Sequence, residues 1–289
     1  MIPLKLAGLP EQFGLANLGA SCHFNALLQA LASCPAFLDA AEQLDGTATA
    51  RALAEFARAA RRPAARPGAE TAALFAALLG DIRLRRPRTR YGRGQQSATE
   101  GLALLLEMCE PPDESGPVGR LFEFEQLAQV VCACGKRGSP ARDTCRQYEF
   151  FHHAGTPMKP QEFSEKMRFH SEPLSGHACA ACGSDIATRY YNLTKAPQIL
   201  AVVFDQYRGH KKRYFPTRFT LGGRYEYAAV AQIEHGGSLH GGHYWATALR
   251  REPAGLRVSR LDDTHVGAGE IGPAATVYVV FYHFRRLTQ

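Results

Sequence analysis

The sequence predicts an α+β fold in which a helical part precedes a part built from antiparallel strands. Up to about residue 110, apolar residues recur every three to four positions. From about residue 118, short β-rich segments alternate with loops rich in glycine, proline and charge. Helices first and strands later are typical of the α+β class. With 45% hydrophobic and 21% charged residues among 289, the chain can bury a sizeable core, so wholesale disorder is excluded.

Three helical stretches are expected in the first part of the chain. The first covers residues 22–60 and begins with FNALLQALASC, whose apolar residues are spaced by three to four. A breaker, RRPAARPG at 61–68, separates it from a second stretch at 71–84. A third stretch follows at 95–110, where Ser97 and Glu100 have the spacing of a capping box. The segment PPDESGP then ends the helical part.

The second part of the chain is expected to form a succession of short strands. The strand-like pieces are QLAQVVCACG (126–135), YNLTKAP (191–197), QILAVVFDQY (198–207), GGRYEYAAVAQIEH (222–235), HGGHYWATALR (240–250), GLRVSRLDD (255–263) and ATVYVVFYHF (275–284).

The composition and the N-terminus narrow the class of protein. The segment MIPLKLAGLPEQFG has no long apolar run, and no stretch of about 18 apolar residues exists anywhere, so neither a signal peptide nor a spanning helix is expected. We expect a protein of the cytoplasm or nucleus that does not engage membranes. The charge of +7 would favour acidic partners. However, Tyr91 is the only aromatic residue within the arginine-rich stretches 61–66 and 83–93, so a nucleic-acid partner is not expected.

The eight cysteines are not expected to form a disulfide framework, because the chain has no secretory signal. They are therefore core residues, metal ligands or nucleophiles. Cys22 follows a loop with Gly14, Asn17 and Gly19 and begins the first helix, where unpaired N–H groups favour a thiolate. A small buried core residue is the alternative for Cys22.

A thiol nucleophile needs a base and a group that orients the base. His243 follows two glycines at the start of a strand-like run, and Asp262 and Asp263 lie on the next one. Adjacent antiparallel strands would bring Asp262 beside His243. The nearby His240 is the alternative base, but the tyrosine that follows His243 favours His243.

Four ordered sequence blocks resemble those of the ubiquitin-specific protease family. GLANLGASCHFNALLQAL at 14–31 resembles the cysteine box G-L-x-N-L-G-x-T-C-x-x-N-x-x-L-Q-x-L and departs from it mainly at Ser21. GQQSATEGLALLLEMC at 94–109 resembles the G-Q-Q-D-A-x-E-F helix, with Ser97 and Gly101 as departures. HGGHYWATAL resembles the histidine box, and RLDDTHV resembles the strand of the third catalytic residue. The chain also ends like the family, on ATVYVVFYHF.

This resemblance implies a papain-like cysteine protease with a helical thumb, an antiparallel β palm and zinc-ribbon-like fingers. It implies one catalytic domain over residues 1–289, with the thumb at about 1–117, fingers and part of the palm at 118–200, and the palm at 201–289. The implied reaction is hydrolysis of the (iso)peptide bond after the terminal Gly-Gly of ubiquitin. The implied partners are ubiquitin or ubiquitinated proteins, and we expect a monomer.

The resemblance also implies the role of individual residues. The nucleophile is Cys22, the general base His243, the orienting carboxylate Asp262 and the oxyanion-hole amide Asn17. Because neighbouring residues of a strand point to opposite faces, Asp263 could instead reach the oxyanion region. The residues expected near the substrate tail are Gln96, Ser97, Glu100, Gly242 and Tyr244. Ser97 stands where the family has an aspartate, so it either relaxes recognition of the tail's arginine or simply caps its helix.

Two cysteine pairs predict a structural zinc site. Cys179 and Cys182 have C-x-x-C spacing, and Cys132 and Cys134 form a shorter C-x-C pair about 45 residues earlier. The shorter spacing loses the usual knuckle geometry, so Cys145 or His177 could replace Cys132 as the fourth ligand. A degenerate ribbon without metal is the alternative.

Three other functions stay open at this point. One is a protease of the same fold for a ubiquitin-like modifier. Another is a catalytically weak ubiquitin-binding scaffold, which the intact set of four catalytic candidates disfavours. The third is a basic zinc-containing nucleic-acid binder, which the ordered blocks disfavour. Compactness and compositional bias would suit a viral or bacterial protein that acts inside a host cell.

Overall fold

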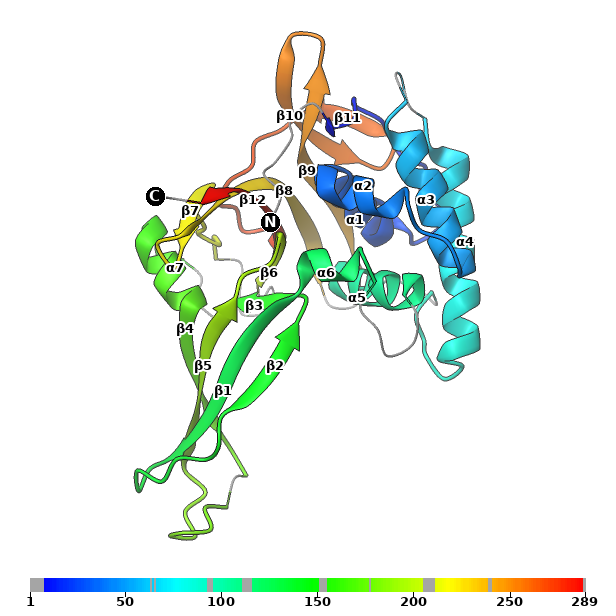
Figure 1. Ribbon diagram of the computed structural model, residues 1–289. Coiled ribbons are helices and arrows are strands. Elements are labelled where there is room, and N and C mark those ends of the chain that lie inside the picture. The colour runs from blue at the N-terminus through cyan, green and yellow to red at the C-terminus, as the bar shows by residue number, and fades with distance from the viewer. Residues whose placement is uncertain are drawn as a thin grey trace.

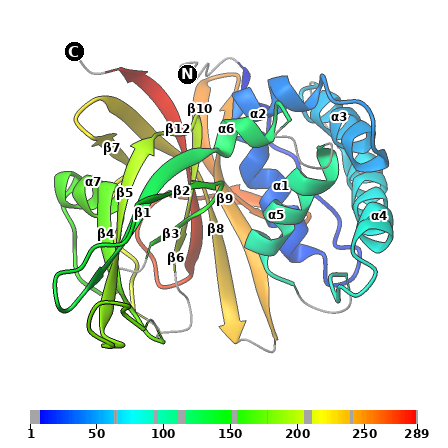
Figure 2. The same ribbon diagram turned by 60° about the horizontal axis from the view of Figure 1, so that its bottom comes forward.

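A computed structural model describes residues 8–62, 64, 66–92, 96–110, 116–150, 155–176, 178–204, 211–238 and 241–287. The predicted α+β class is confirmed, because the N-terminal helices gather on one side of a large, mainly antiparallel sheet, with α7 on the other side (Figures 1 and 2). In the described residues the helices are α1 (Cys22–Ala32), α2 (Pro35–Ala41), α3 (Ala48–Ala60), α4 (Gly68–Arg85), α5 (Ala98–Cys109), α6 (Gly119–Phe122) and α7 (Pro160–Arg168). None of them has both the length and the apolar composition of a membrane-spanning segment.

The first helix, α1, is a core helix rather than a surface one, because all of its residues are buried. It packs against α2, α5 and the large sheet. The predicted stretch 22–60 is divided into three helices. The first break is at Ser33, where Pro35 begins α2 with a residue that needs no N–H partner, and the second is the turn before Thr47, which caps α3.

The strands form two sheets. The strands are β1 (Phe124–Cys132), β2 (Ala141–Cys145), β3 (Tyr148–Phe150), β4 (Phe169–Leu174), β5 (Ala187–Lys195), β6 (Ile199–Phe204), β7 (Arg218–Leu221), β8 (Tyr225–Ser238), β9 (Gly241–Glu252), β10 (Gly255–Asp262), β11 (His265–Ala268) and β12 (Val277–Leu287). The larger sheet has the order β11-β10-β9-β8-β12-β6-β3, with β7 beside β8, and only the β3–β6 pair is parallel. The smaller sheet has the order β2-β1-β5-β4 and extends away from the rest (Figure 1).

Two apolar cores cover the two faces of the larger sheet. One contains α1 and the other N-terminal helices, and the other contains α7, β7 and the aromatic residues of β6 and β12. The strands β2, β3, β4, β7 and β11 and the helices α6 and α7 were not predicted, because each of these segments is too short to show a clear periodicity. The smaller sheet spans Phe124 to Lys195; the division of the chain into thumb, fingers and palm by residue range stays a prediction.

One buried cation joins the first helix to the large sheet. Arg250 of β9 is fully buried, and its guanidinium donates to the backbone carbonyls of Gln29 and Leu249 and to the hydroxyl of Ser33 at the carboxyl end of α1. A cation at this end complements the helix dipole. Burial lowers the pKa of Arg250 to about 9, so the guanidinium still carries its charge at neutral pH. The strand of His243 is thereby fixed to the helix of Cys22.

Candidate active site

Cys22 is the first residue of α1, with Ser21 as the N-cap residue. The preceding loop reaches the helix through Gly19 and Ala20, both with positive φ (84° and 52°). Ser21, at the position where the resembled family has threonine, does not cap with its side chain; its Oγ instead accepts from the N–H of Leu18 at 2.8 Å. The thiol therefore lies beside the unpaired N–H groups of a helix N-terminus, which favour an anion there.

Asn17 organises the loop before Cys22. Its Oδ1 accepts from the backbone N–H of Gly19 at 3.0 Å and of Ser21 at 3.3 Å. Its Nδ2 donates one hydrogen to Asp263 Oδ2 at 2.9 Å. An amide NH₂ has two hydrogens, and among the described residues only Asp263 accepts from it, so the other N–H can face a ligand beside the thiol loop.

His243 and Asp262 meet across the β9–β10 pair. His243 Nε2 lies 2.5 Å from Asp262 Oδ1, which leaves Nδ1 for a reacting thiol. Within the described residues no hydrogen bond joins Cys22 to His243, although α1 packs on β9. Such contacts are often loose before substrate binds. His240, the alternative base, lies outside the described residues.

The two adjacent carboxylates point in different directions. Asp263 has φ 51° in the two-residue turn between β10 and β11, and one of its carboxylate oxygens lies within 4.8 Å of a ring nitrogen of His243. Its Oδ2 accepts from Asn17, and its Oδ1 accepts from Asn25 at 2.7 Å. Asp262 thus contacts the imidazole, and Asp263 contacts the amide expected at the oxyanion. The hydrogen bond from Asn17 to Asp263 is the contact that a role for Asp263 at the oxyanion site would require.

Sequence reasoning missed Asn25. It lies on α1 three residues after Cys22, where the cysteine box also has asparagine, and its amide donates to Ala16 O and Asp263 Oδ1. The turn between β10 and β11 is also held by the loop before Cys22, because the N–H of Leu15 donates to Asp263 O at 2.8 Å. A side chain at Gly14 would overlap the backbone of Thr264, so this close approach requires glycine.

Arg260 is a second residue that sequence reasoning missed. Its Nη2 donates to Asp262 Oδ2 at 3.0 Å. Burial raises the pKa of Asp262, but the hydrogen bonds from His243 and Arg260 outweigh this effect and hold the pKa below its usual range. Asp262 is therefore an anion at neutral pH, as a group that stabilises an imidazolium must be.

A buried histidine supports the thiol loop. His23 is 1% exposed; its Nδ1 lies 3.0 Å from Ala20 O, and its Nε2 lies 3.0 Å from the hydroxyl of Tyr91. Burial lowers the pKa of His23 to about 4, so the ring is neutral. A Cβ at Gly101 would lie 2.9 Å from the Tyr91 hydroxyl, which explains why glycine replaces the family's aromatic residue.

The expected substrate-tail residues occupy different environments. Ser97 is the N-cap of α5, and its Oγ accepts from Thr99 N rather than from Glu100 N, so Ser97 caps the helix without the bond to Glu100 N that a capping box requires. Its Oγ also lies 2.7 Å from the hydroxyl of Tyr278 on β12. Glu100 lies in the first turn of α5, and Gln96 just precedes the cap.

Gly242 and Tyr244 flank His243 on β9. A Cβ at Gly242 would overlap the ring of His235 and the backbone of Gly236, so only glycine fits beside the neighbouring strand. Tyr244 is 4% exposed, and its ring packs 4.4 Å from that of His235. Whether any of the five residues contacts a substrate stays a prediction.

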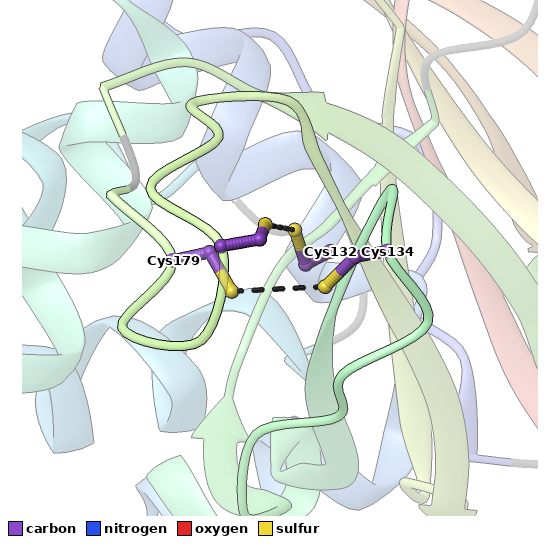
Figure 3. Close-up of side chains that lie close together, drawn as sticks. Cys132, Cys134 and Cys179 are labelled. Atoms are coloured by element: carbon purple, nitrogen blue, oxygen red, sulfur yellow. Dashed lines mark hydrogen bonds between the residues drawn. The ribbon is translucent and has the colours of Figure 1, made fainter.

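The four predicted cysteines come together at the far end of the smaller sheet (Figure 3). The Sγ atoms of Cys132 and Cys182 are 3.6 Å apart, and those of Cys134 and Cys179 are 3.9 Å apart. A disulfide would need about 2.05 Å. Four sulfurs at about 2.3 Å from one zinc ion would be about 3.8 Å apart. The cluster therefore has the donor set and spacing of a tetrahedral metal site.

The C-x-C spacing does not prevent this geometry. Gly135 and Gly183, each directly after the second cysteine of a pair, have φ 86° and 71°, so both loops turn sharply. The N–H of Gly135 donates to Cys132 O, and the N–H of Gly183 donates to Cys179 O. Cys145, considered as a replacement ligand, pairs with Phe124 at the other end of β1 and is not in the cluster; His177 lies outside the described residues.

A sequence profile of the ubiquitin carboxyl-terminal hydrolase family matches residues 13–282. The chain belongs to this family. It is a cysteine-type deubiquitinating enzyme, so the function expected from the sequence is confirmed at this level. No curated protein shows significant sequence similarity to the hydrolase.

Solved structures of deubiquitinating assemblies share the fold of this hydrolase. A chain of the SAGA DUB module Ubp8/Sgf11/Sus1/Sgf73 bound to monoubiquitin matches with a TM-score of 0.69 and 16% identity. The match covers 100% of the hydrolase and 72% of that chain. The same module bound to ubiquitin aldehyde matches with the same values. A yeast SAGA DUB module with an Sgf73 mutant matches with a TM-score of 0.72, 17% identity and the same coverage.

Proposed function

We propose that the hydrolase cleaves the (iso)peptide bond after the C-terminal Gly-Gly of ubiquitin, with Cys22 as the nucleophile. The observation that carries this proposal is the His243–Asp262 hydrogen bond beside a thiol at a helix N-terminus. The similar structures that contain ubiquitin or ubiquitin aldehyde support ubiquitin as the partner. We expect the chain to act as a monomer.

The geometry assigns a role to each group. His243 Nδ1 accepts the thiol proton, and the Cys22 sulfur attacks the carbonyl carbon of the terminal glycine. The negative charge that develops on the carbonyl oxygen is stabilised by the free N–H of Asn17 and by backbone N–H groups at the start of α1. His243 then gives the proton to the leaving amine as the C–N bond breaks, so the amine departs and the ubiquitin carbonyl stays bound to Cys22 as a thioester. Water hydrolyses the thioester with His243 as the base, and Asp262 stabilises the imidazolium throughout.

Asp263 has a separate role in this proposal. It orients the amide of Asn17, because the Asp263 carboxylate accepts one N–H of Asn17 and leaves the other in place for the oxyanion. Asn25 and Leu15 hold Asp263 itself in position. The two aspartates thus serve the base and the oxyanion site respectively.

The four-cysteine cluster is proposed to hold a structural zinc ion. Cys132, Cys134, Cys179 and Cys182 would each provide a thiolate, and a closed set of four ligands leaves no open position for catalysis.

Hydrolysis of ubiquitin with a C-terminal fluorogenic amide tests the assignment. Cys22→Ala should reduce kcat by at least about 10³-fold, as expected for a lost nucleophile. Cys145→Ala is the control, because Cys145 is a partly exposed thiol far from the site. Retention of more than about a hundredth of the activity by Cys22→Ala would refute the role of Cys22. Parallel reactions with ubiquitin-like modifiers decide between ubiquitin and a related substrate.

A further inference from the structure

Four side chains form a continuous strip beside the catalytic residues. His243 and Trp245 alternate along β9, and Arg260 and Asp262 alternate along β10. The register of the two strands places all four side chains on the same face of the sheet. The strip thus contains two residues of the proposed mechanism and two that the mechanism has not used.

The contacts within the strip are specific. The guanidinium of Arg260 lies 4.4 Å from the centroid of the Trp245 ring. The imidazole of His243 stacks beside the same ring, at 6.3 Å and 25° between planes. The Asp262 carboxylate receives His243 on Oδ1 and Arg260 on Oδ2, so both of its oxygens are occupied by donors.

An exposed arginine ordinarily contributes little free energy to an ion pair. The side chain of Arg260 is 47% exposed, and exposed ion pairs are weak because the long side chain must be held in one geometry. Here the electron-rich face of the indole attracts the guanidinium and restricts it. Trp245 thereby holds Arg260 against one oxygen of Asp262, which fixes the rotation of the carboxylate and keeps the other oxygen directed at His243.

We propose that Arg260, held on the face of Trp245, is a positioning residue for this enzyme. It acts through Asp262, whose carboxylate it locks in the orientation that holds the imidazole. This inference rests on the proposed function, since it concerns the proposed base. It predicts that removal of the Arg260 side chain lowers kcat only while Asp262 is present. Removal of a residue that merely stabilises the fold would lower kcat equally with and without Asp262.

A double-mutant cycle tests this dependence. Arg260→Ala should lower kcat for ubiquitin with a fluorogenic amide about tenfold, in line with the loss of one charge-assisted hydrogen bond, and leave KM within about twofold. In an Asp262→Ala background the same change should alter the residual kcat by less than about twofold. Arg260→Lys keeps one donor and one charge and should recover part of kcat, although it loses the planar stacking geometry.

Arg257→Ala is the matched control. Arg257 lies on the same strand, is 47% exposed like Arg260 and pairs with Glu252 at 3.2 Å, so its loss removes the same charge without touching Asp262. It should leave kcat unchanged. Thermal unfolding of each variant, followed by circular dichroism, checks that the fold is intact.

Two results would overturn the inference. One is a wild-type kcat for Arg260→Ala, and the other is an equal loss of kcat in both backgrounds. If Asp262→Ala impairs turnover while Arg260→Ala does not, only this inference fails. If Asp262→Ala leaves turnover intact, the proposed roles of His243 and Asp262 fail with it.

Discussion

The catalytic centre and the four-cysteine cluster bring distant residues together by opposite means. Cys22 begins a helix whose residues are all buried, and His243 lies on a strand that this helix covers. The cysteine cluster lies at the end of a sheet whose strand β2 is almost fully exposed and whose strand β4 is only half-buried. Packing can hold the first site together, whereas little apolar surface is available to hold the second. We therefore expect the loss of a bound metal to disturb the cluster far more than the catalytic centre.

Metal removal should have the largest effect and should separate the two regions. The binding free energy of a structural zinc site is on the order of 10 kcal/mol and contributes directly to folding. The purified, reduced enzyme should contain close to one equivalent of zinc, and a chelator should lower its melting temperature. Cys179→Ser should lose the metal. Absence of zinc in freshly purified protein would indicate a ribbon that is held by packing.

Removal of the metal should leave the reactivity of Cys22 nearly unchanged. Because α1 and β9 belong to the larger sheet and its core, whereas the cluster lies on the smaller sheet, alkylation of Cys22 by a small electrophile such as iodoacetamide should keep its rate within about threefold after chelation, a change of under 1 kcal/mol in the barrier. Binding of ubiquitin should weaken. Loss of alkylation together with zinc would show that the two regions fold as one unit.

The next largest effect distinguishes the two aspartates. Asp262→Ala should lower kcat by about 10³- to 10⁴-fold, because the base then loses its orienting carboxylate. Asp263→Ala should lower it by about 10- to 100-fold, because Asn17 stays in place but is less well oriented. Steady-state kinetics on a fluorogenic ubiquitin substrate measures both. A greater loss for Asp263→Ala would exchange the two roles without changing the type of reaction.

The pH dependence of stability should reveal His23. Burial lowers the pKa of His23 to about 4, against about 6.5 in the unfolded chain, so the unfolded state binds more protons between these values. The free energy of unfolding should therefore fall by about 3 kcal/mol as pH decreases from 6.5 to 4. His23→Gln should remove this contribution from urea-unfolding curves. Equal pH slopes for the two proteins would mean that the pKa of His23 is the same in the folded and unfolded states.

The smallest effect concerns Ser97. Ser97→Ala should lower the free energy of unfolding by about 1 kcal/mol, because α5 loses its N-cap, whereas Ser97→Asp should cap equally well. The aspartate variant also tests tail recognition. If Ser97 is only a cap, the ratio of kcat/KM between ubiquitin and a ubiquitin with alanine at its tail arginine should not change. A higher ratio in the aspartate variant would make Ser97 a specificity residue.

Part of the site could be read from the sequence because it consists of local patterns. A cysteine at the start of an apolar helix and a histidine after two glycines are visible in short segments, and their order matches one family. The same holds for the cysteine pairs, although the C-x-C spacing argued against a regular knuckle. Gly135 resolves that conflict, because its positive φ turns the chain within the shorter loop.

The remainder depends on contacts that no local pattern contains. The direction of Asp263 follows from a positive φ and from two asparagines some 240 residues away. Gly101 departs from the pattern of its sequence block, and the structure explains this departure because the Tyr91 hydroxyl occupies the space that a side chain would need. Arg260 lies two residues before Asp262 and Trp245 two residues after His243, inside two separate sequence blocks, and only strand pairing places their side chains together.

The site of covalent modification tests the central claim most directly. Ubiquitin with a C-terminal cysteine-reactive electrophile should form one adduct with the wild-type enzyme, and peptide mass spectrometry should locate it on Cys22 among the eight cysteines. The adduct should be absent from Cys22→Ala and should form slowly with Asp262→Ala. An adduct on any other cysteine, or none on a folded and zinc-loaded enzyme, would contradict the account.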